Sequence, residues 1–289
     1  MQVSFEESTA SGSSQVQKPE KSHTVARCAV FSGRPLEYGV SLFIAIALLV
    51  LAEVAAGEKW ISPMVLPKPS AVFSVLTEGL RDGTYIVSIV SSMSSLVVGF
   101  ILAFVAAIVI AGVISSNRFI ERVFTPYIVA FQSMPKVAVA PLVVLWLGFG
   151  ELSKIMIVVI VCFFPMMVNT VQGLKVRHQD HDELMRSLGA NSWQQFLLMR
   201  LPHAVPYIFA GVRIGVIFAL IGVVVAEFVG TNAGVGFSML QAKSQFDVPS
   251  VYACLLILMV MGLVLNFLTS ICERRVAMLM GESAAGRRY

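Results

Sequence analysis

Six long apolar segments constrain the fold of this 289-residue chain more than any other feature of its sequence. Each segment is close to, or longer than, the roughly 20 residues that an α-helix needs to cross the hydrocarbon core of a bilayer. They are residues 38–56, 86–114, 124–147, 155–174, 206–229 and 251–271. Hydrophobic residues make up 57% of the chain and charged residues 13%, whereas soluble domains carry about 25% charge. The sequence therefore predicts an all-α membrane protein with six transmembrane helices.

Most positively charged residues fall on one of the two sides that six spans define. Fourteen of the 21 Lys and Arg residues fall on the side of the termini, and four fall on the other side. Lys154, expected at a membrane edge, would be a fifth on that other side. Because cytoplasmic loops are enriched in Lys and Arg, we expect both termini in the cytoplasm. The net charge of +4 is small for this length and gives no indication of a nucleic-acid partner.

Composition divides the chain into four parts. Residues 1–34 are polar and Ser-rich, lack the apolar core of a signal peptide, and are interpreted as a disordered cytoplasmic tail. Residues 35–84 hold the first span and an outer segment with a short helix at 71–80. Residues 85–275 form the core, in which 230–250 is expected to be an outer loop, and residues 276–289 are a second cytoplasmic tail.

Small residues in two of the spans indicate where helices pack closely. Gly99 follows a run of serines in the second span, and Gly211, Gly215 and Gly222 recur along the fifth. Small side chains let the backbones of membrane helices approach one another. We therefore expect these faces to be helix contacts.

The third span is interrupted by three prolines and carries a polar stretch. Broken polar backbone at membrane depth is tolerated only where it is buried in protein or lines a water-filled cavity. Two interpretations follow, a pore-lining segment, which we favour, and a kinked packing helix. The candidates for lining a pathway are Gln132, Ser133, Met134 and Lys136, together with Glu227 of the fifth span.

A long polar break separates the fourth span from the fifth, at residues 176–206. Leu184, Met185 and Leu188 recur at spacings of three and four, which places them on one face of a short helix. Gly189 is expected to end this helix in a turn, because glycine tolerates a positive φ.

A second short helix is expected directly after this turn. Ser192, with Gln195 three residues later, matches the capping-box pattern. Pro202 and Pro206 are expected to end the helix before the fifth span begins. Two short amphipathic helices at such a bend fit either a hairpin on the membrane surface or a docking site for a soluble partner.

The polar break also resembles a known motif. Glu183, Gly189 and the pair Leu201-Pro202 match, at every spacing, the EAA signature of ABC importer permeases, E-A-A-x3-G-x9-I-x-L-P. The chain departs from that signature at residues 184, 185 and 199. Segments 134–154, 163–174 and 226–240 resemble permeases of the nitrate/sulfonate/taurine group, which also contains permeases for pyrimidine, riboflavin and aromatic-acid substrates.

The resemblance implies the type I importer permease fold and an ATP-driven importer in the bacterial cytoplasmic (inner) membrane. It implies a homodimer, two cytoplasmic ABC ATPase subunits and a periplasmic or lipid-anchored solute-binding protein. The solute would be nitrate-, sulfonate- or taurine-like, with a pyrimidine, riboflavin or aromatic acid as the alternative. The bend at Gly189 would enter a groove on the ATPase. The candidate coupling residues are Glu183, Leu184, Leu188, Gly189, Trp193, Phe196, Leu201 and Pro202.

No motif for ATP binding or catalysis occurs in the chain itself. It has no G-x-x-x-x-G-K-[ST] sequence and therefore no P-loop, and its four cysteines form no C-x-x-C pair. We expect a transport subunit without an ATPase site, metal or cofactor, with ATP and Mg²⁺ bound by the partner. The rival interpretation is an ion-coupled secondary transporter that uses Lys136, Arg213 and Glu227 as intramembrane ionisable groups.

Overall fold

The computed structural model describes residues 35–58, 62–175, 187 and 189–279. Within these ranges every regular element is a helix, and none is a strand. The chain divides into two units, Met1–Leu48 and Leu49–Tyr289. The described part of the first unit is the start of α1, and the packing described below lies in the second. The expected tails and the coupling candidates Glu183, Leu184 and Leu188 lie outside the described residues.

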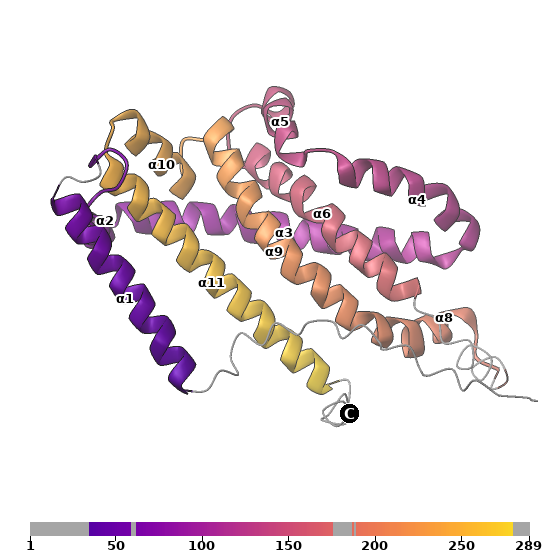
Figure 1. Cartoon of the computed structure of the whole chain (residues 1–289). Coiled ribbons are helices and arrows are strands. Elements are labelled where there is room, and N and C mark those ends of the chain that lie inside the picture. Colours follow the sequence, from indigo (N-terminus) through magenta and orange to yellow (C-terminus); the bar gives the residue numbers. More distant parts are fainter. Residues whose placement is uncertain (1–34, 59–61, 176–186, 188, 280–289) are drawn as a thin grey trace, which may run out of the picture. The chain divides into compact units, whose positions relative to one another are not determined.

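Figure 1 shows the helices, coloured in the order in which they follow one another along the chain. They are α1 (Pro35–Gly57), α2 (Pro69–Arg81), α3 (Thr84–Ser116), α4 (Arg118–Ser133), the 3₁₀ turn η1 (Lys136–Val139), α5 (Ala140–Leu147), α6 (Glu151–Lys175), α8 (Ser192–Gln195), the π-helical turn η2 (Phe196–Arg200), α9 (Leu201–Gly230), α10 (Val235–Ser244) and α11 (Val248–Leu279). Five of these segments are long and apolar enough to cross a membrane. The pair formed by α4 and η1–α5, bent by 81°, is a sixth if it counts as one span.

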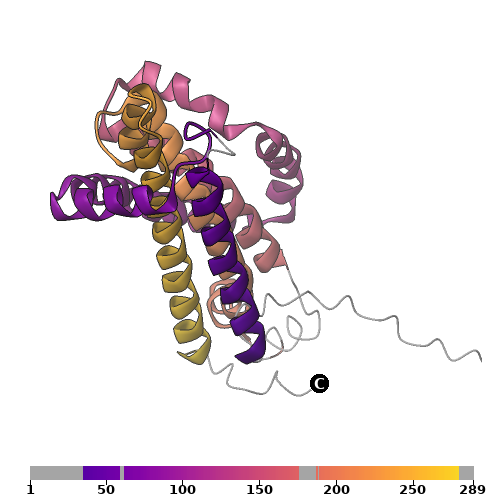
Figure 2. The ribbon, with the colours of Figure 1, turned by 60° about the vertical axis from the view of Figure 1, so that its left-hand side comes forward.

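The bent pair connects opposite ends of the bundle, as one span would (Figures 1 and 2). Glu121, in the first turn of α4, pairs with Lys175 at the end of α6, at 3.0 Å between Nζ and Oε1. Just after α5, the N–H of Gly150 donates to the carbonyl of Gly230 at the end of α9, at 3.0 Å. Gly150 directly precedes α6, so the bent pair runs from one end of α6 to the other. Each of the six predicted spans is therefore matched by a helix or, for the third, by this pair.

Helices α3, α6 and α9 form the core of the bundle through the small residues that the sequence indicated. A Cβ added to Gly99 of α3 would lie 2.8 Å from Val158 of α6. A Cβ added to Gly215 of α9 would lie 2.7 Å from Cγ of Met166, and one at Gly222 would lie 3.3 Å from the backbone of Val158. The expected helix contacts are therefore confirmed, and these glycines set how closely the helices approach.

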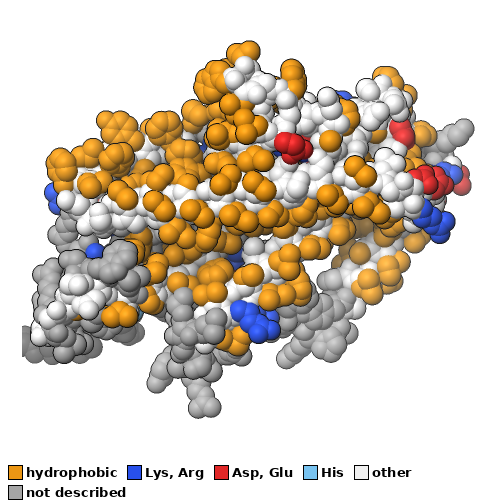
Figure 3. Space-filling model, turned by 180° about the vertical axis from the view of Figure 1, so that it is seen from behind, with side chains coloured by type: hydrophobic (Ala, Val, Ile, Leu, Met, Phe, Trp, Pro, Cys, Tyr) orange, Lys and Arg blue, Asp and Glu red, His pale blue; other side chains and the backbone are white. Residues whose placement is uncertain are grey.

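Helix α3 has two faces of different composition. Ala103, Ala107 and Ala111 recur every four residues and are 0% exposed against the core. On the opposite face large apolar side chains such as Val105 and Val109 are more than half exposed. In Figure 3 hydrophobic side chains cover much of the visible face of the molecule. Such a surface suits lipid, in which apolar side chains need no covering protein.

Two expectations about the ends of elements are wrong. The predicted outer loop at 230–250 contains the ten-residue helix α10. Helix α8 begins at Ser192, so the residue before it is Asn191, and Asn191 and Gln194 form a capping box one residue earlier than predicted, with side-chain to backbone hydrogen bonds of 2.8 and 2.9 Å.

The prolines after α8 do not end a helix. The chain continues from α8 through the π-helical turn η2 directly into α9. Pro202 directly follows the π-helical turn, in which the N–H of Leu201 donates to the carbonyl of Phe196, and this shifted hydrogen-bond register accommodates a residue without an N–H. Pro206 lies inside α9, which continues past it to Gly230.

Candidate functional site

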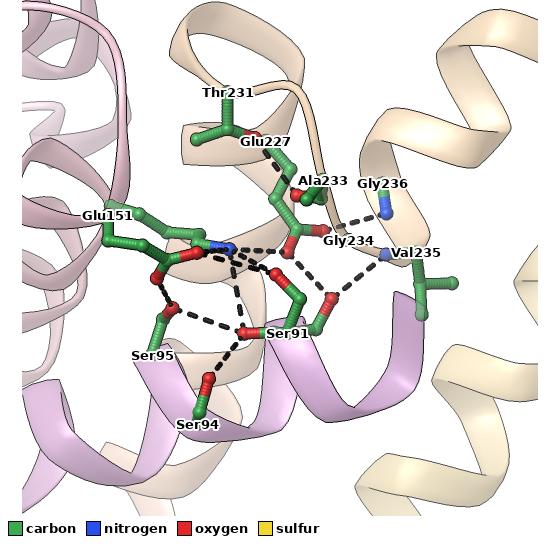
Figure 4. A network of polar contacts seen from close by, with 12 residues as sticks. Ser91, Ser94, Ser95, Glu151, Glu227, Thr231, Ala233, Gly234, Val235 and Gly236 are labelled. Atoms are coloured by element: carbon green, nitrogen blue, oxygen red, sulfur yellow. Dashed lines mark hydrogen bonds and ion pairs between the residues drawn. The ribbon is translucent and has the colours of Figure 1, made fainter. Parts of the chain in front are cut away.

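The most enclosed polar site described in the chain centres on Lys154, near the start of α6. Figure 4 shows the network around it, with Ser91, Glu151 and Glu227 labelled. The side chain of Lys154 is 0% exposed. Nζ lies 3.0 Å from Oε1 of Glu151, one turn earlier, and 3.5 Å from Oε1 of Glu227 on α9. Nζ also donates to Oγ of Ser91 on α3, at 3.0 Å. A buried ammonium is tolerated only when it is paired and hydrogen-bonded, and Lys154 is both.

Glu227 is also buried and has its own set of donors. Oγ of Ser92 donates to Oε1 at 2.6 Å, and the N–H of Gly236 donates to Oε2 at 2.7 Å. The same Ser92 oxygen accepts the N–H of Val235 at 2.9 Å. Val235 and Gly236 are the first residues of α10, so the carboxylate lies where the partial positive charge of that helix is greatest.

Gly234 is required by the close approach of the chain to this carboxylate. Its φ is +119°, and a Cβ built on it would lie 1.9 Å from Oε1 of Glu227. No other residue fits such a contact without displacing the carboxylate or the loop. The sequence Gly-Val-Gly before and at the start of α10 is thereby explained.

The serines of α3 extend the network to Glu151. Ser95 donates a short hydrogen bond from Oγ to Oε2 of Glu151, and Ser91 donates to Oε1 at 3.4 Å. The side chain of Glu151 is 58% exposed, so this carboxylate forms the open edge of the network. The network joins α3, α6, α9 and α10 by charge-assisted hydrogen bonds, which are stronger than neutral ones.

The network changes the interpretation of two ionisable residues. Glu227 was a candidate for lining a pathway, but it is 1% exposed and its carboxylate contacts α3, α6 and α10. Sequence reasoning missed Lys154, which it placed at a membrane edge. The spacing of Lys154 three residues after Glu151 was the one available signal, since residues three apart are neighbours on a helix.

The other pathway candidates lie together at the break between α4 and η1. The side chains of Gln132, Ser133 and Met134 are exposed, and that of Lys136 is partly buried. Oγ of Ser133 donates back to the carbonyl of Val129 at 3.0 Å. Exposed polar side chains at the break between α4 and η1 are what the wall of a water-filled cavity requires.

The coupling candidates are described only in part. Gly189 has a φ of +75°, in the left-handed region expected for the turn, and a Cβ built on it would meet none of the described residues within 4 Å. Phe196 and Leu201 are partly buried against the core formed by α3, α6 and α9. Pro202 is also partly buried, and the side chain of Trp193 lies outside what the structure describes. Phe196 and Leu201 therefore attach the segment to its own subunit.

Arg213, the remaining ionisable group considered within the spans, pairs with Glu273 of α11. Both side chains of this pair are partly exposed, at 48% and 29%. Cys162 and Cys254 are buried, as expected for apolar fillers. Across the described ranges no three His, Cys, Asp or Glu residues come together in a group that could hold a metal ion.

Comparisons with known proteins agree on one family. Residues 99–278 match the family model described as binding-protein-dependent transport system inner membrane component. The formylaminopyrimidine transport permease protein ThiX of Halalkalibacterium halodurans is 33% identical over 219 residues, which cover 75% of this chain and 86% of that protein. The riboflavin transport system permease protein RibX of Chloroflexus aurantiacus is 34% identical over 227 residues, or 78% of this chain and 85% of that one.

A more distant relative and two solved structures complete the comparison. The putative aliphatic sulfonates transport permease protein SsuC of Bacillus subtilis is 28% identical over 81% of this chain and 85% of that one. An inward-facing MetNI methionine ABC transporter has a TM-score of 0.56 and 18% identity over 64% of this chain and 93% of that one. An amino acid ABC transporter with histidines has a TM-score of 0.54 and 14% identity over 69% and 97%. At these identities, the two structures establish a shared fold.

Proposed function

This chain belongs to the family of binding-protein-dependent transport system inner membrane components, and we propose that it is the permease subunit of an ATP-driven importer of a small organic solute. The observation that carries the proposal is the family match over residues 99–278. That range contains the bent third span, the buried network and the polar break with its turn at Gly189.

We assign the energy source to a separate protein. The chain lacks a P-loop, so ATP and Mg²⁺ would be bound by a pair of cytoplasmic ABC ATPase subunits that contact the segment around Gly189. A solute-binding protein would deliver the solute from the other side, and a second copy of the chain would complete the pathway. The complex would lie in the bacterial cytoplasmic membrane, with both termini in the cytoplasm.

The continuity of α8, η2 and α9 supports a mechanism for coupling. A displacement of α8, which begins three residues after Gly189, would be passed directly into α9, because no loop separates α8 from α9. At the far end of α9, Glu227 holds the start of α10 and Lys154 of α6. ATP-driven closure of the ATPases would therefore move α6, α9 and α10 as one body, which is alternating access by rigid-body motion.

The solute class is narrowed by the relatives, which are named for formylaminopyrimidine, riboflavin and aliphatic sulfonates. We propose a sulfonate-like solute first, as the resemblance of segments 134–154, 163–174 and 226–240 to the nitrate/sulfonate/taurine group implies. A pyrimidine or riboflavin is the alternative, which the relatives named for such compounds support at 33 and 34% identity.

Reconstituted transport tests the proposal. The chain is purified with the ATPase encoded beside it, placed in proteoliposomes and supplied with the neighbouring solute-binding protein. We expect uptake of one solute class that requires ATP, the binding protein and an intact ATPase. Uptake driven by a proton or sodium gradient in vesicles without the ATPase would instead support the secondary transporter.

A further inference from the structure

We infer that Lys136, at the break of the third span, forms a cationic and aromatic site that selects small organic anions as solutes. The inference rests on the proposed transport function and adds a charge preference to it. It arises from the surroundings of one ammonium group, which come from three helices far apart in the sequence.

The ammonium of Lys136 lies between two aromatic rings. Nζ is 5.7 Å from the ring centroid of Phe164 on α6 and 5.9 Å from that of Phe218 on α9. Phe131 of α4 stacks on Phe164 with 5.8 Å between centroids, and it is 52% exposed. The rings attract the cation through their quadrupoles but do not neutralise its charge. The site therefore combines a positive charge with an exposed apolar surface.

Lys136 differs from the other lysines and arginines that lie within the bundle. Lys154, Lys175 and Arg213 each lie within 4 Å of a glutamate. In the described parts of the chain Lys136 has no such partner, and its one hydrogen bond is a long one, 3.5 Å, to the carbonyl of Gln132. An ammonium has three donors, so capacity remains for an anionic ligand.

The position of Lys136 makes this charge available to a solute. It follows the break directly, beside the exposed side chain of Gln132, whose amide adds two further N–H donors. A solute with a sulfonate or carboxylate head would approach these donors, while a compact apolar body would contact Phe131. A neutral heterocycle would use only the rings, so the site favours the anion.

Thiol reactivity measures the charge preference without any solute or partner. Ser133→Cys is made in a Cys28→Ser/Cys272→Ser background, which leaves the buried Cys162 and Cys254. Purified protein in nonionic detergent is treated with methanethiosulfonates of similar size carrying a sulfonate or a quaternary ammonium. Since three residues span at most about 11 Å, the charge of Lys136 acts on the reagent at residue 133. We expect the ratio of the anionic rate to the cationic rate to fall at least about threefold in Lys136→Gln.

Two companion variants separate charge from folding. Lys136→Arg should keep the ratio, and Lys243→Gln, which removes an exposed lysine of α10, should leave it unchanged. An equal ratio in Lys136 and Lys136→Gln proteins would overturn the inference. So would loss of the preference on adding phosphatidylglycerol, because the site would then be occupied by a lipid headgroup.

Transport by the complete importer is the second test of the inference. Ethanesulfonate uptake should show a KM raised about tenfold or more in Lys136→Gln and restored in Lys136→Arg. Uptake of riboflavin with no ethanesulfonate uptake would contradict the anion preference while leaving the proposed function intact. Failure of all ATP-driven uptake would contradict the proposed function, whereas the thiol assay would still report on the site.

Discussion

At the scale of single residues, the ion pairs of this protein differ in what they contribute. Lys154 and Glu227 are both 0% exposed in their side chains, whereas Arg213 and Glu273 are partly exposed. A buried ion pair stabilises the folded protein little more than an apolar pair of similar size would. Removing one partner is costly, however, because it leaves an uncompensated charge in the interior. An exposed pair contributes about 0–1 kcal/mol.

Lys154→Met should therefore destabilise the subunit by about 3–5 kcal/mol, because Glu227 remains buried without its cation. Adding Glu227→Gln should recover much of this loss, since the amide keeps an oxygen for the N–H of Gly236. Reversible unfolding in detergent measures the free energy of unfolding of the single and the double variant. Glu273→Gln is the control, and its free energy of unfolding should change by less than about 1 kcal/mol. A Lys154→Met protein as stable as the wild type would show that Glu227 relaxes to solvent.

Gly234→Ala should lower the free energy of unfolding by about 2 kcal/mol or more. Its φ of +119° disfavours any side chain, and the new Cβ would lie 1.9 Å from Glu227. Gly112→Ala is the matched control, because a Cβ there meets nothing within 4 Å, and it should be neutral or slightly stabilising. Equal melting temperatures for the two variants would contradict the close approach at Gly234.

The sequence distinguished these residues only in part. Glu227 was conspicuous because an acidic residue in a long apolar segment is costly. Lys154 was not, because a lysine at the start of a span usually extends its ammonium to water. That Lys154 turns inward depends on the serines of α3, some 60 residues earlier, and on Glu227, and no local pattern reveals such contacts.

At the scale of elements, segment length and hydropathy predicted the spans. They did not predict where shorter helices begin or continue, which depends on backbone hydrogen bonding. The six apolar segments and the glycine faces of the second and fifth spans were correct. Helix α10 was missed because its mixed residues follow two turn-forming glycines and show no apolar periodicity. Pro202 and Pro206 were predicted to end a helix, but a π-helical turn continues directly into α9, which contains both prolines.

The segment around Gly189 can be tested as an element. Gly189→Asp should leave the subunit folded, because a Cβ at this position meets none of the described residues within 4 Å and the positive φ costs about 1 kcal/mol of stability. The same change should weaken assembly with the ATPase and abolish uptake, since the side chain would occupy the space that the partner needs. Glu183→Ala should act in the same direction but more mildly.

Co-purification of the ATPase, uptake and the melting temperature of the free subunit together decide this prediction. A loss of assembly with an unchanged melting temperature supports docking at Gly189. Full assembly and full transport by Gly189→Asp would mean that residues 176–206 are only a hairpin at the membrane surface.

At the scale of the whole molecule, the fold determines which segments share a side of the membrane. Glu121 pairs with Lys175, so the α3–α4 connection and the end of α6 lie at one end of the bundle. Glu151, Lys154 and α10 lie at the other, around the buried network. The solute could not be predicted from the sequence in the same way, because in the proposed function a separate binding protein selects and delivers it.

The distribution of charge then predicts the orientation of this bundle. By the sequence, fourteen Lys and Arg residues fall on the side of the six spans that is expected to carry the termini and the polar break, against four or five on the other side. The positive-inside rule places the richer end in the cytoplasm. In intact cells, a membrane-impermeant thiol reagent should therefore label Ser244→Cys of α10 and should not label Asn117→Cys, between α3 and α4. Both should react after permeabilisation, which controls for accessibility. The reverse pattern would place Gly189 outside the cell, away from ATP, and the proposed coupling to a cytoplasmic ATPase would then be wrong.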